Sequence, residues 1–229
     1  MKYFKYLSLT ILVLTISINI SNAQFVTPIN SISGPAEVTT LDGTIIKGDL
    51  KMASFGNNGI TSFSLKDEAG VKHKFKADEV KMLKLKVDGL AKLEIIGEQS
   101  SNLSKLANSN FKEITEREFI YWKRVKHPDK DKYFLLQLLN PGFDSVLEVY
   151  DLPNARTAES FSGDLAISGD MPKAYYVIKN GETLEIKKKK YKKQDFELLF
   201  SDCPIIIENN KPDFKHFAEH VFFYNEYCQ

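Results

Sequence analysis

Hydrophobic and polar residues alternate repeatedly in the first half of the chain. In the runs Val71–Lys76 and Leu83–Val87, apolar positions alternate with lysines, and this alternation predicts half-buried strands with the lysines on the solvent side. The pair Asp42-Gly43 is typical of a tight hairpin turn, and Gly48 indicates a bend or a bulge. The pattern therefore predicts five or six short strands, with one helical turn at residues 77–80.

The strand spacing and turn positions from Ala36 to about Ile96 resemble those of small SH3-like or Sm-like barrels. We therefore expect a small SH3-like β-barrel over residues 36–97, which includes the apolar run Leu90–Ile96. The resemblance implies a binding role, because such barrels serve many kinds of binding and few kinds of catalysis, although a fold alone does not assign a function.

Serine and asparagine clusters fill residues 98–110 and predict a linker. Beyond it, Phe119–Val125 is rich in aromatic and β-branched residues. This composition favours a strand over the helix that the capping-box pattern at Thr115–Glu118 would start. Tyr133–Leu139 is nearly continuous in apolar residues and predicts a central buried strand, and Val146–Tyr150 predicts another strand.

The pair Asn180-Gly181 lies between two runs rich in β-forming residues and predicts a type I′ hairpin. Counting outward from this turn pairs Val177 with Leu184, Tyr175 with Ile186 and Tyr176 with Glu185. Residues from Lys189 onward should then lie at or beyond the end of the strand pairing.

Helices are predicted after the hairpin. Phe196–Phe200 should form a short helix before Pro204, and the last helix should run from the N-cap Asp213 to Tyr227. Strands followed by helices indicate an α+β domain over residues 111–229, in which the C-terminal helices cover an antiparallel sheet.

The N-terminus has the pattern of a secretory signal peptide. Lys2 and Lys5 precede an apolar run, and Ser21-Asn22-Ala23 fits a cleavage site, so we expect cleavage after Ala23 and a periplasmic or extracellular protein. Removal of residues 1–23 takes away two lysines and changes the formal net charge from +1 to −1. Residues 24–35 are polar and are expected to form a loose lead-in, and we expect the mature chain to have no transmembrane segment.

The chain contains two cysteines, Cys203 and Cys228. An even number of cysteines in an exported protein favours a disulfide, because thiols oxidise outside the cytosol. The alternative is two free thiols.

Six lysines lie close together near the C-terminus of this otherwise neutral chain. This lysine cluster consists of Lys187, Lys188, Lys189, Lys190, Lys192 and Lys193. It is either a solvated junction between the hairpin and the helices, or a binding site for anionic glycan, lipopolysaccharide or an anionic membrane surface. Another envelope protein is a further possible partner, whereas the expected compartment argues against nucleic acid.

The residues His216, Glu219 and His220 match the H-x-x-E-H pattern of a zinc peptidase family. Two histidines four residues apart on a helix can bind one metal ion. That family takes its third ligand well downstream, whereas here nine residues follow His220, none of them Asp or His. A zinc-dependent hydrolase is therefore the alternative, and we expect a protein that is not an enzyme and needs no metal or cofactor.

Three stretches of the second half also resemble uncharacterised secreted proteins of Gram-negative bacteria. They are Leu138–Asp144, Val149–Asp151 and Phe200–Pro204. The resemblance implies a location in the cell envelope and no particular chemistry. The sequence thus predicts an exported binding or scaffolding protein.

Overall fold

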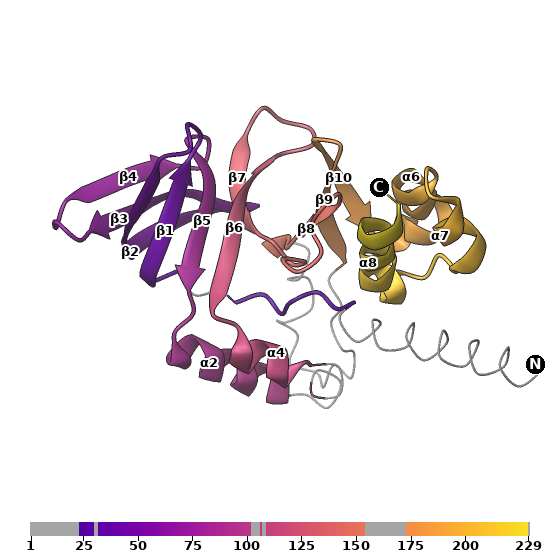
Figure 1. The fold of residues 1–229 in the computed structure, drawn as a ribbon, viewed down its shortest axis with the longest axis horizontal. Helices are drawn as coiled ribbons and strands as arrows, with labels where there is room; N and C mark the ends of the chain where they lie inside the picture. Colours follow the sequence, from indigo (N-terminus) through magenta and orange to yellow (C-terminus); the bar gives the residue numbers. More distant parts are fainter. Residues whose placement is uncertain (1–22, 30–31, 102–105, 107–108, 154–172, 229) are drawn as a thin grey trace, which may run out of the picture.

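The computed structural model describes residues 23–29, 32–101, 106, 109–153 and 173–228. These residues form a closed antiparallel barrel, a second sheet and a group of C-terminal helices (Figure 1). The predicted α+β class is confirmed, as is a small barrel. The predicted signal peptide, apart from Ala23, lies outside the described residues.

Six strands close the barrel, in the order β1-β5-β6-β7-β3-β2 and back to β1. Their bounds are β1 (Gly34–Thr40), β2 (Ile45–Gly56), β3 (Gly59–Asp67), β5 (Val80–Lys86), β6 (Phe119–Lys126) and β7 (Tyr133–Gln137). Strand β4 (Lys72–Lys76) lies beside β3 at the edge of the same sheet. Val38, Leu65, Leu83 and Ile120 are buried inside the barrel core.

Strand β2 is long and pairs with two neighbouring strands. Its first part pairs with β1 and its later part with β3, and Gly48 pairs with Ala36 on one side and Asp67 on the other. A Cβ atom on Gly48 would lie 2.2 Å from the backbone oxygen of Lys66. The absence of a side chain therefore allows two strands to approach this closely, as the predicted bend requires.

The barrel closes where β3 meets β7, at the pair Ile60 and Leu135. Gly59 precedes this pair with a φ of 147°, and a Cβ atom there would lie 2.5 Å from Cδ2 of Leu136. Glycine thus satisfies both the backbone conformation and the close packing at the closure.

The predicted division at residues 98–110 differs from the observed sheet. Strands β6 and β7 follow that segment, yet β6 pairs along β5 and β7 pairs with β3. The barrel therefore extends beyond residues 36–97, because strands from both sides of the expected linker are needed to close it.

The apolar run predicted at Leu90–Ile96 lies within helix α2 (Gly89–Ser100), which also occupies the first residues of the expected linker. The Asp88 carboxylate caps this helix by accepting a 2.7 Å hydrogen bond from the Ala91 N–H. Ala91 and Ile95 are its buried residues, and their spacing of four residues is helical. Helix α4 (Phe111–Glu116) packs beside α2.

The second sheet contains β8 (Glu148–Tyr150), β9 (Ala174–Lys179) and β10 (Glu182–Lys187). The predicted register of the hairpin is confirmed at all three pairs: Val177 with Leu184, Tyr175 with Ile186, and Tyr176 with Glu185. Asn180 and Gly181 have φ values of 52° and 79°, as a type I′ turn requires.

Residues 23–29 are more than the predicted loose lead-in. The centres of the Phe25 and Phe217 rings lie 5.5 Å apart, and the Val26 N–H donates to the Leu139 backbone oxygen at 2.8 Å. The Ile29 side chain is buried in the barrel core, and its N–H donates to Gln137 at 3.1 Å. The apolar residues of this segment thus fill both cores, and it runs across the molecule between them (Figure 1).

The C-terminal helices lie at the end of the molecule opposite the barrel, and we call residues 188–228 the helical end (Figure 1). The helices are α5 (Lys188–Lys190), the π-helix η3 (Tyr191–Asp195), α6 (Phe196–Phe200), α7 (Pro204–Asn209), the 3-10 helix η4 (Phe214–His216) and α8 (Phe217–Tyr227). Asp213 is an N-cap as predicted, accepting from the Lys215 N–H at 3.1 Å. In the described part of the chain, every helix is too short or too polar to span a membrane.

Candidate anion-binding site

The lysine cluster begins where the β9–β10 hairpin ends. Lys187 is the last residue of β10, Lys188–Lys190 form α5, and Lys192 and Lys193 lie in the π-helix η3. The prediction that strand pairing stops before Lys189 is therefore confirmed. Lys187 is half-buried, and the other five lysines are exposed.

Tyr191 interrupts the lysines and anchors them to the core. It is fully buried, its hydroxyl is 2.7 Å from Nδ1 of His220, and its ring lies 5.4 Å from the rings of Phe214 and Phe217. Burial raises the pKa of the Tyr191 hydroxyl, so the residue stays neutral at ordinary pH. Because Tyr191 points inward, the lysines before and after it are directed to solvent.

A buried aspartate fixes the other side of this segment. The Asp195 carboxylate accepts a 2.8 Å hydrogen bond from the Lys187 N–H, which ties the π-helix to the end of β10. Neither Tyr191 nor Asp195 was predicted from sequence to be part of the site. The one signal in the sequence was the single tyrosine within a run of lysines.

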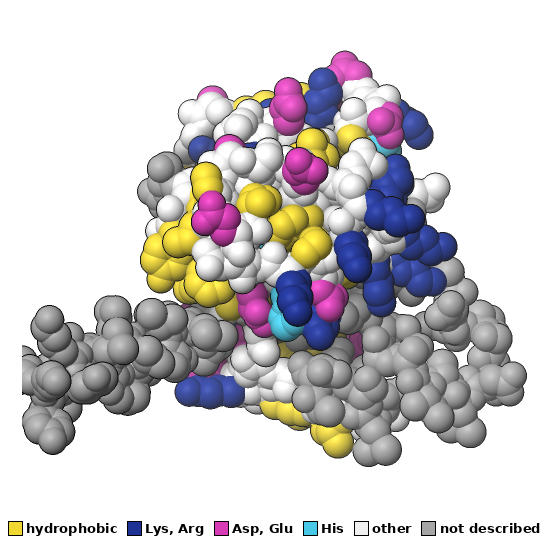
Figure 2. All heavy atoms as spheres, turned by 90° about the vertical axis from the view of Figure 1, so that its right-hand side faces the viewer, with side chains coloured by type: hydrophobic (Ala, Val, Ile, Leu, Met, Phe, Trp, Pro, Cys, Tyr) yellow, Lys and Arg dark blue, Asp and Glu magenta, His cyan; other side chains and the backbone are white. Residues whose placement is uncertain are grey.

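The charge of the lysine cluster is largely uncompensated. Lys187 pairs with Glu185 at 2.8 Å. Among the described residues, none forms an ion pair with Lys188, Lys189, Lys190, Lys192 or Lys193. Figure 2 shows Lys and Arg side chains gathered along one side of the helical end. Five like charges on two short helical turns repel one another, so an anion bound there would lower their mutual repulsion.

A disulfide holds the framework behind the lysine cluster. Cys203 and Cys228 are bonded, with their Cα atoms 5.6 Å apart, and this confirms the predicted pair. Beside it, the buried Lys179 ammonium donates to the Leu199 oxygen at 2.5 Å and to Asp202 at 2.9 Å, and Asp202 also accepts from the Tyr224 hydroxyl at 2.9 Å. These bonds join β9 to α6 and α8.

The electrostatics of Asp202 follow from these bonds. Desolvation acts to raise the pKa of its carboxyl, but the hydrogen bonds from Lys179 and Tyr224 outweigh it and hold that pKa below its usual value. Asp202 is therefore ionised and paired with Lys179, and it does not neutralise the charge of the lysine cluster.

Loss of the disulfide should destabilise the protein. The bond closes a separation of 25 residues, and a loop of that length contributes about 3 kcal/mol to the free energy of unfolding. Cys203→Ser combined with Cys228→Ser should therefore lower that free energy by about 3 kcal/mol in urea unfolding monitored by circular dichroism. Addition of reductant should do the same to the native protein and nothing to the double variant. A double variant as stable as the native protein would contradict the prediction.

The residues of the H-x-x-E-H pattern already have partners within the protein. His220 is buried, and its Nδ1 is bonded to Tyr191, while Nδ1 of His216 lies 3.0 Å from Glu219. Burial lowers the pKa of His220 to about 4, so the ring is neutral at ordinary pH. In the described residues no group of three or more His, Cys, Asp and Glu side chains is placed to hold a metal ion.

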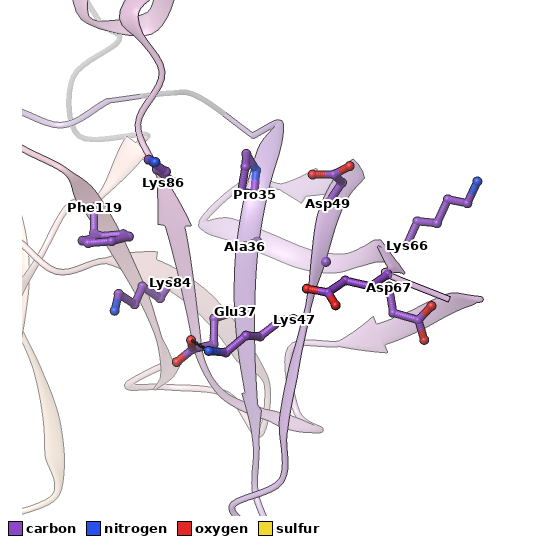
Figure 3. Close-up of a pocket in the computed structure, with 12 residues that line it drawn as sticks. Pro35, Ala36, Glu37, Lys47, Asp49, Lys66, Asp67, Lys84, Lys86 and Phe119 are labelled. Atoms are coloured by element: carbon purple, nitrogen blue, oxygen red, sulfur yellow. Dashed lines mark ion pairs between the residues drawn. The ribbon is translucent and has the colours of Figure 1, made fainter. Parts of the chain in front are cut away.

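A groove with a volume of about 520 Å³ opens on the barrel surface (Figure 3). Glu37 pairs with Lys47 there at 3.4 Å, and the Lys84 ammonium lies 4.2 Å from the centre of the Phe119 ring. The charged residues that line it are Glu37, Asp49, Asp67, Glu68, Lys47, Lys66, Lys84 and Lys86. Acidic and basic groups are thus equal in number, and the groove has none of the charge excess of the lysine cluster.

Comparisons with known proteins found no family model, no curated protein and no solved structure that matches this chain.

Proposed function

We propose that this protein is exported, is not an enzyme, and binds an anionic component of the cell envelope through the lysine cluster. The observation that carries the proposal is local charge. Five exposed lysines without an acidic partner among the described residues sit on a framework fixed by Tyr191, Asp195 and a disulfide. Cations that project from a fixed backbone suit a polyanion, because each neutralised charge adds to the affinity and the backbone needs no ordering on binding.

Two features support a periplasmic or extracellular location. The first 23 residues have the pattern of a cleaved leader. The Cys203–Cys228 disulfide is suited to an oxidising compartment, where such bonds persist. The resemblance to secreted proteins of Gram-negative bacteria stays a prediction consistent with both.

We also propose that β1 to β5 form an SH3-like unit to which β6 and β7 have been added. The support is topological: β1 pairs with both β2 and β5, and the bent β2 passes from β1 to β3, which pairs with β4. This relation would make the barrel a scaffold or an additional binding surface, in keeping with a role in recognition rather than catalysis.

Binding of the mature protein to heparin, used as a soluble polyanion, tests the anion-binding proposal. Changing Lys188, Lys189, Lys190 and Lys192 to Gln should weaken binding at low salt by at least about 10-fold, because four charge contacts are lost, and should reduce its dependence on salt.

The matched control changes four exposed lysines of the barrel, Lys72, Lys74, Lys76 and Lys81, to Gln. This control alters the net charge of the protein by the same amount. Equal losses of heparin affinity in the two quadruple variants would show that net charge, and not the lysine cluster, is responsible, and the proposal would be withdrawn.

A further inference from the structure

Apolar side chains are exposed on the same helical end that carries the lysine cluster. Leu198 on α6 is 50% exposed, Ile205 and Ile207 on α7 are 54% and 40% exposed, and Tyr227 on α8 is 59% exposed. Figure 2 faces this end and shows hydrophobic side chains over its centre and one side, with Lys and Arg along the other side. The exposed apolar side chains and the lysine cluster therefore lie on one face of the molecule.

These apolar residues are held outward by their buried neighbours. Leu198 is followed by the buried Leu199 and Phe200, and Ile206 is buried between the exposed Ile205 and Ile207. Helix α7 starts directly after Cys203 and also contacts α8, so its outer face is rigid. The exposure follows from the packing of the helices, and rotation of α7 to hide Ile205 would expose Ile206.

We propose that the helical end docks onto an anionic lipid surface, with the lysine cluster on the lipid phosphates and Leu198, Ile205 and Ile207 at the boundary between headgroups and acyl chains. The inference rests on the proposed anion binding, since it uses the same lysines. A lipid surface provides both anionic groups and an apolar phase. A dissolved polysaccharide provides the charge but leaves the apolar residues in water.

Acidic residues limit how deeply this surface can enter a membrane. Glu197 and Glu208 are exposed beside Leu198 and Ile207. A carboxylate is costly to transfer out of water, so the contact reaches no deeper than the boundary between headgroups and acyl chains and is reversible. This agrees with helices that are short and packed into the protein core on one side.

Co-sedimentation of the mature protein with vesicles tests the docking proposal. Vesicles of phosphatidylcholine with one third phosphatidylglycerol should bind the protein, and pure phosphatidylcholine vesicles should not. The quadruple lysine variant should bind the anionic vesicles about 600-fold more weakly, because each of the four lysines contributes about 5-fold. Leu198→Ser combined with Ile205→Ser and Ile207→Ser should weaken vesicle binding about 10-fold and leave heparin binding unchanged. Inorganic phosphate at constant ionic strength should not displace the protein from vesicles.

The control triple variant, Ile45→Ser with Met52→Ser and Leu90→Ser, removes apolar residues that are exposed elsewhere, and it should bind vesicles normally. Unfolding midpoints identify any variant that fails to fold, and the single change Leu198→Ser then replaces the triple variant.

Unaltered vesicle binding by the Leu198 triple variant, displacement by free phosphate, or heparin binding without vesicle binding would each overturn lipid docking and leave the anion-binding function standing. Heparin binding unaffected by the lysine changes would remove the anion-binding function itself.

Discussion

Replacing Asn225 by alanine is expected to lower the free energy of unfolding by about 4 kcal/mol. The amide oxygen of this buried residue accepts hydrogen bonds from the N–H groups of Val146 and Leu147, at 2.7 and 2.8 Å. Its amide nitrogen donates to the backbone oxygens of Leu147 and Val221, at 3.2 and 3.0 Å. The side chain thus binds helix α8 to the loop before β8.

The size of the effect follows from what alanine leaves behind. The N–H groups of Val146 and Leu147 lose their acceptor, and each unsatisfied buried group costs about 1–3 kcal/mol, whereas the Leu147 oxygen keeps its hydrogen bond from Asn140. Asn140, also buried, bonds the same loop from the other side through the oxygens of Phe143 and Leu147 and the N–H of Val149. The loop 140–147 therefore depends on two internal amides for its hydrogen bonds, and few alternatives exist within it.

Urea unfolding measured by circular dichroism checks this prediction, with Asn209→Ala as the matched control. Asn209 is an exposed asparagine whose side chain donates to the Ile205 oxygen, which water can also satisfy, so its loss should cost less than about 1 kcal/mol. If Asn225→Ala costs no more than Asn209→Ala, the assigned role of the buried amide is wrong.

Local features of the fold were predictable from sequence. The register of the β9–β10 hairpin follows from Asn180-Gly181, because a two-residue turn with positive φ values leaves one pairing between its flanking strands. The cap at Asp213 and the short helix at Phe196–Phe200 are equally local. These elements depend on neighbours in sequence, and local rules therefore describe them well.

The extent of the barrel was not predictable in this way. Closure depends on β6 and β7, whose partners β5 and β3 are far away in sequence, and no local signal assigns such pairs. The run Leu90–Ile96 was assigned to the barrel. It is too short for periodicity alone to distinguish a strand from a helix. The N-cap at Asp88 favours the helix, and the run lies within α2. Residues 24–35 were judged by their polar composition, while the contacts of Phe25 and Ile29 determine their position.

The candidate site was only partly predictable, because some of its features are local in sequence and others depend on contacts between distant residues. The charge of the lysine cluster is a property of composition, and its place beyond the hairpin follows from the register. The anchor Tyr191, by contrast, is defined by its contact with His220, and the Lys179–Asp202 pair joins residues on different elements. The role of Asn140 was not predicted, because the sequence Asn-Pro-Gly is typical of an exposed turn. In the structure the Asn140 side chain is buried.

Replacing Gly48 by alanine should cost at least about 3 kcal/mol of unfolding free energy or prevent folding. The added Cβ would meet the oxygen and carbon of the Lys66 backbone at 2.2 and 2.7 Å and Cα of Asp67 at 2.8 Å. All three are main-chain atoms of β3, so no side chain can move aside and the two strands must separate. Separation there disrupts β2 at the point where it pairs with β1 and β3 at once.

Gly97→Ala is the control, and its effect should have the opposite sign. Gly97 lies exposed within α2, and a Cβ atom there would meet nothing within 4 Å, so alanine should raise the free energy of unfolding by up to about 1 kcal/mol through its higher helix propensity. Both variants are compared with the native protein in the same urea titration. A Gly48→Ala protein of native stability would show that β2 and β3 do not approach as closely as described. The bent strand β2 would then need a different register.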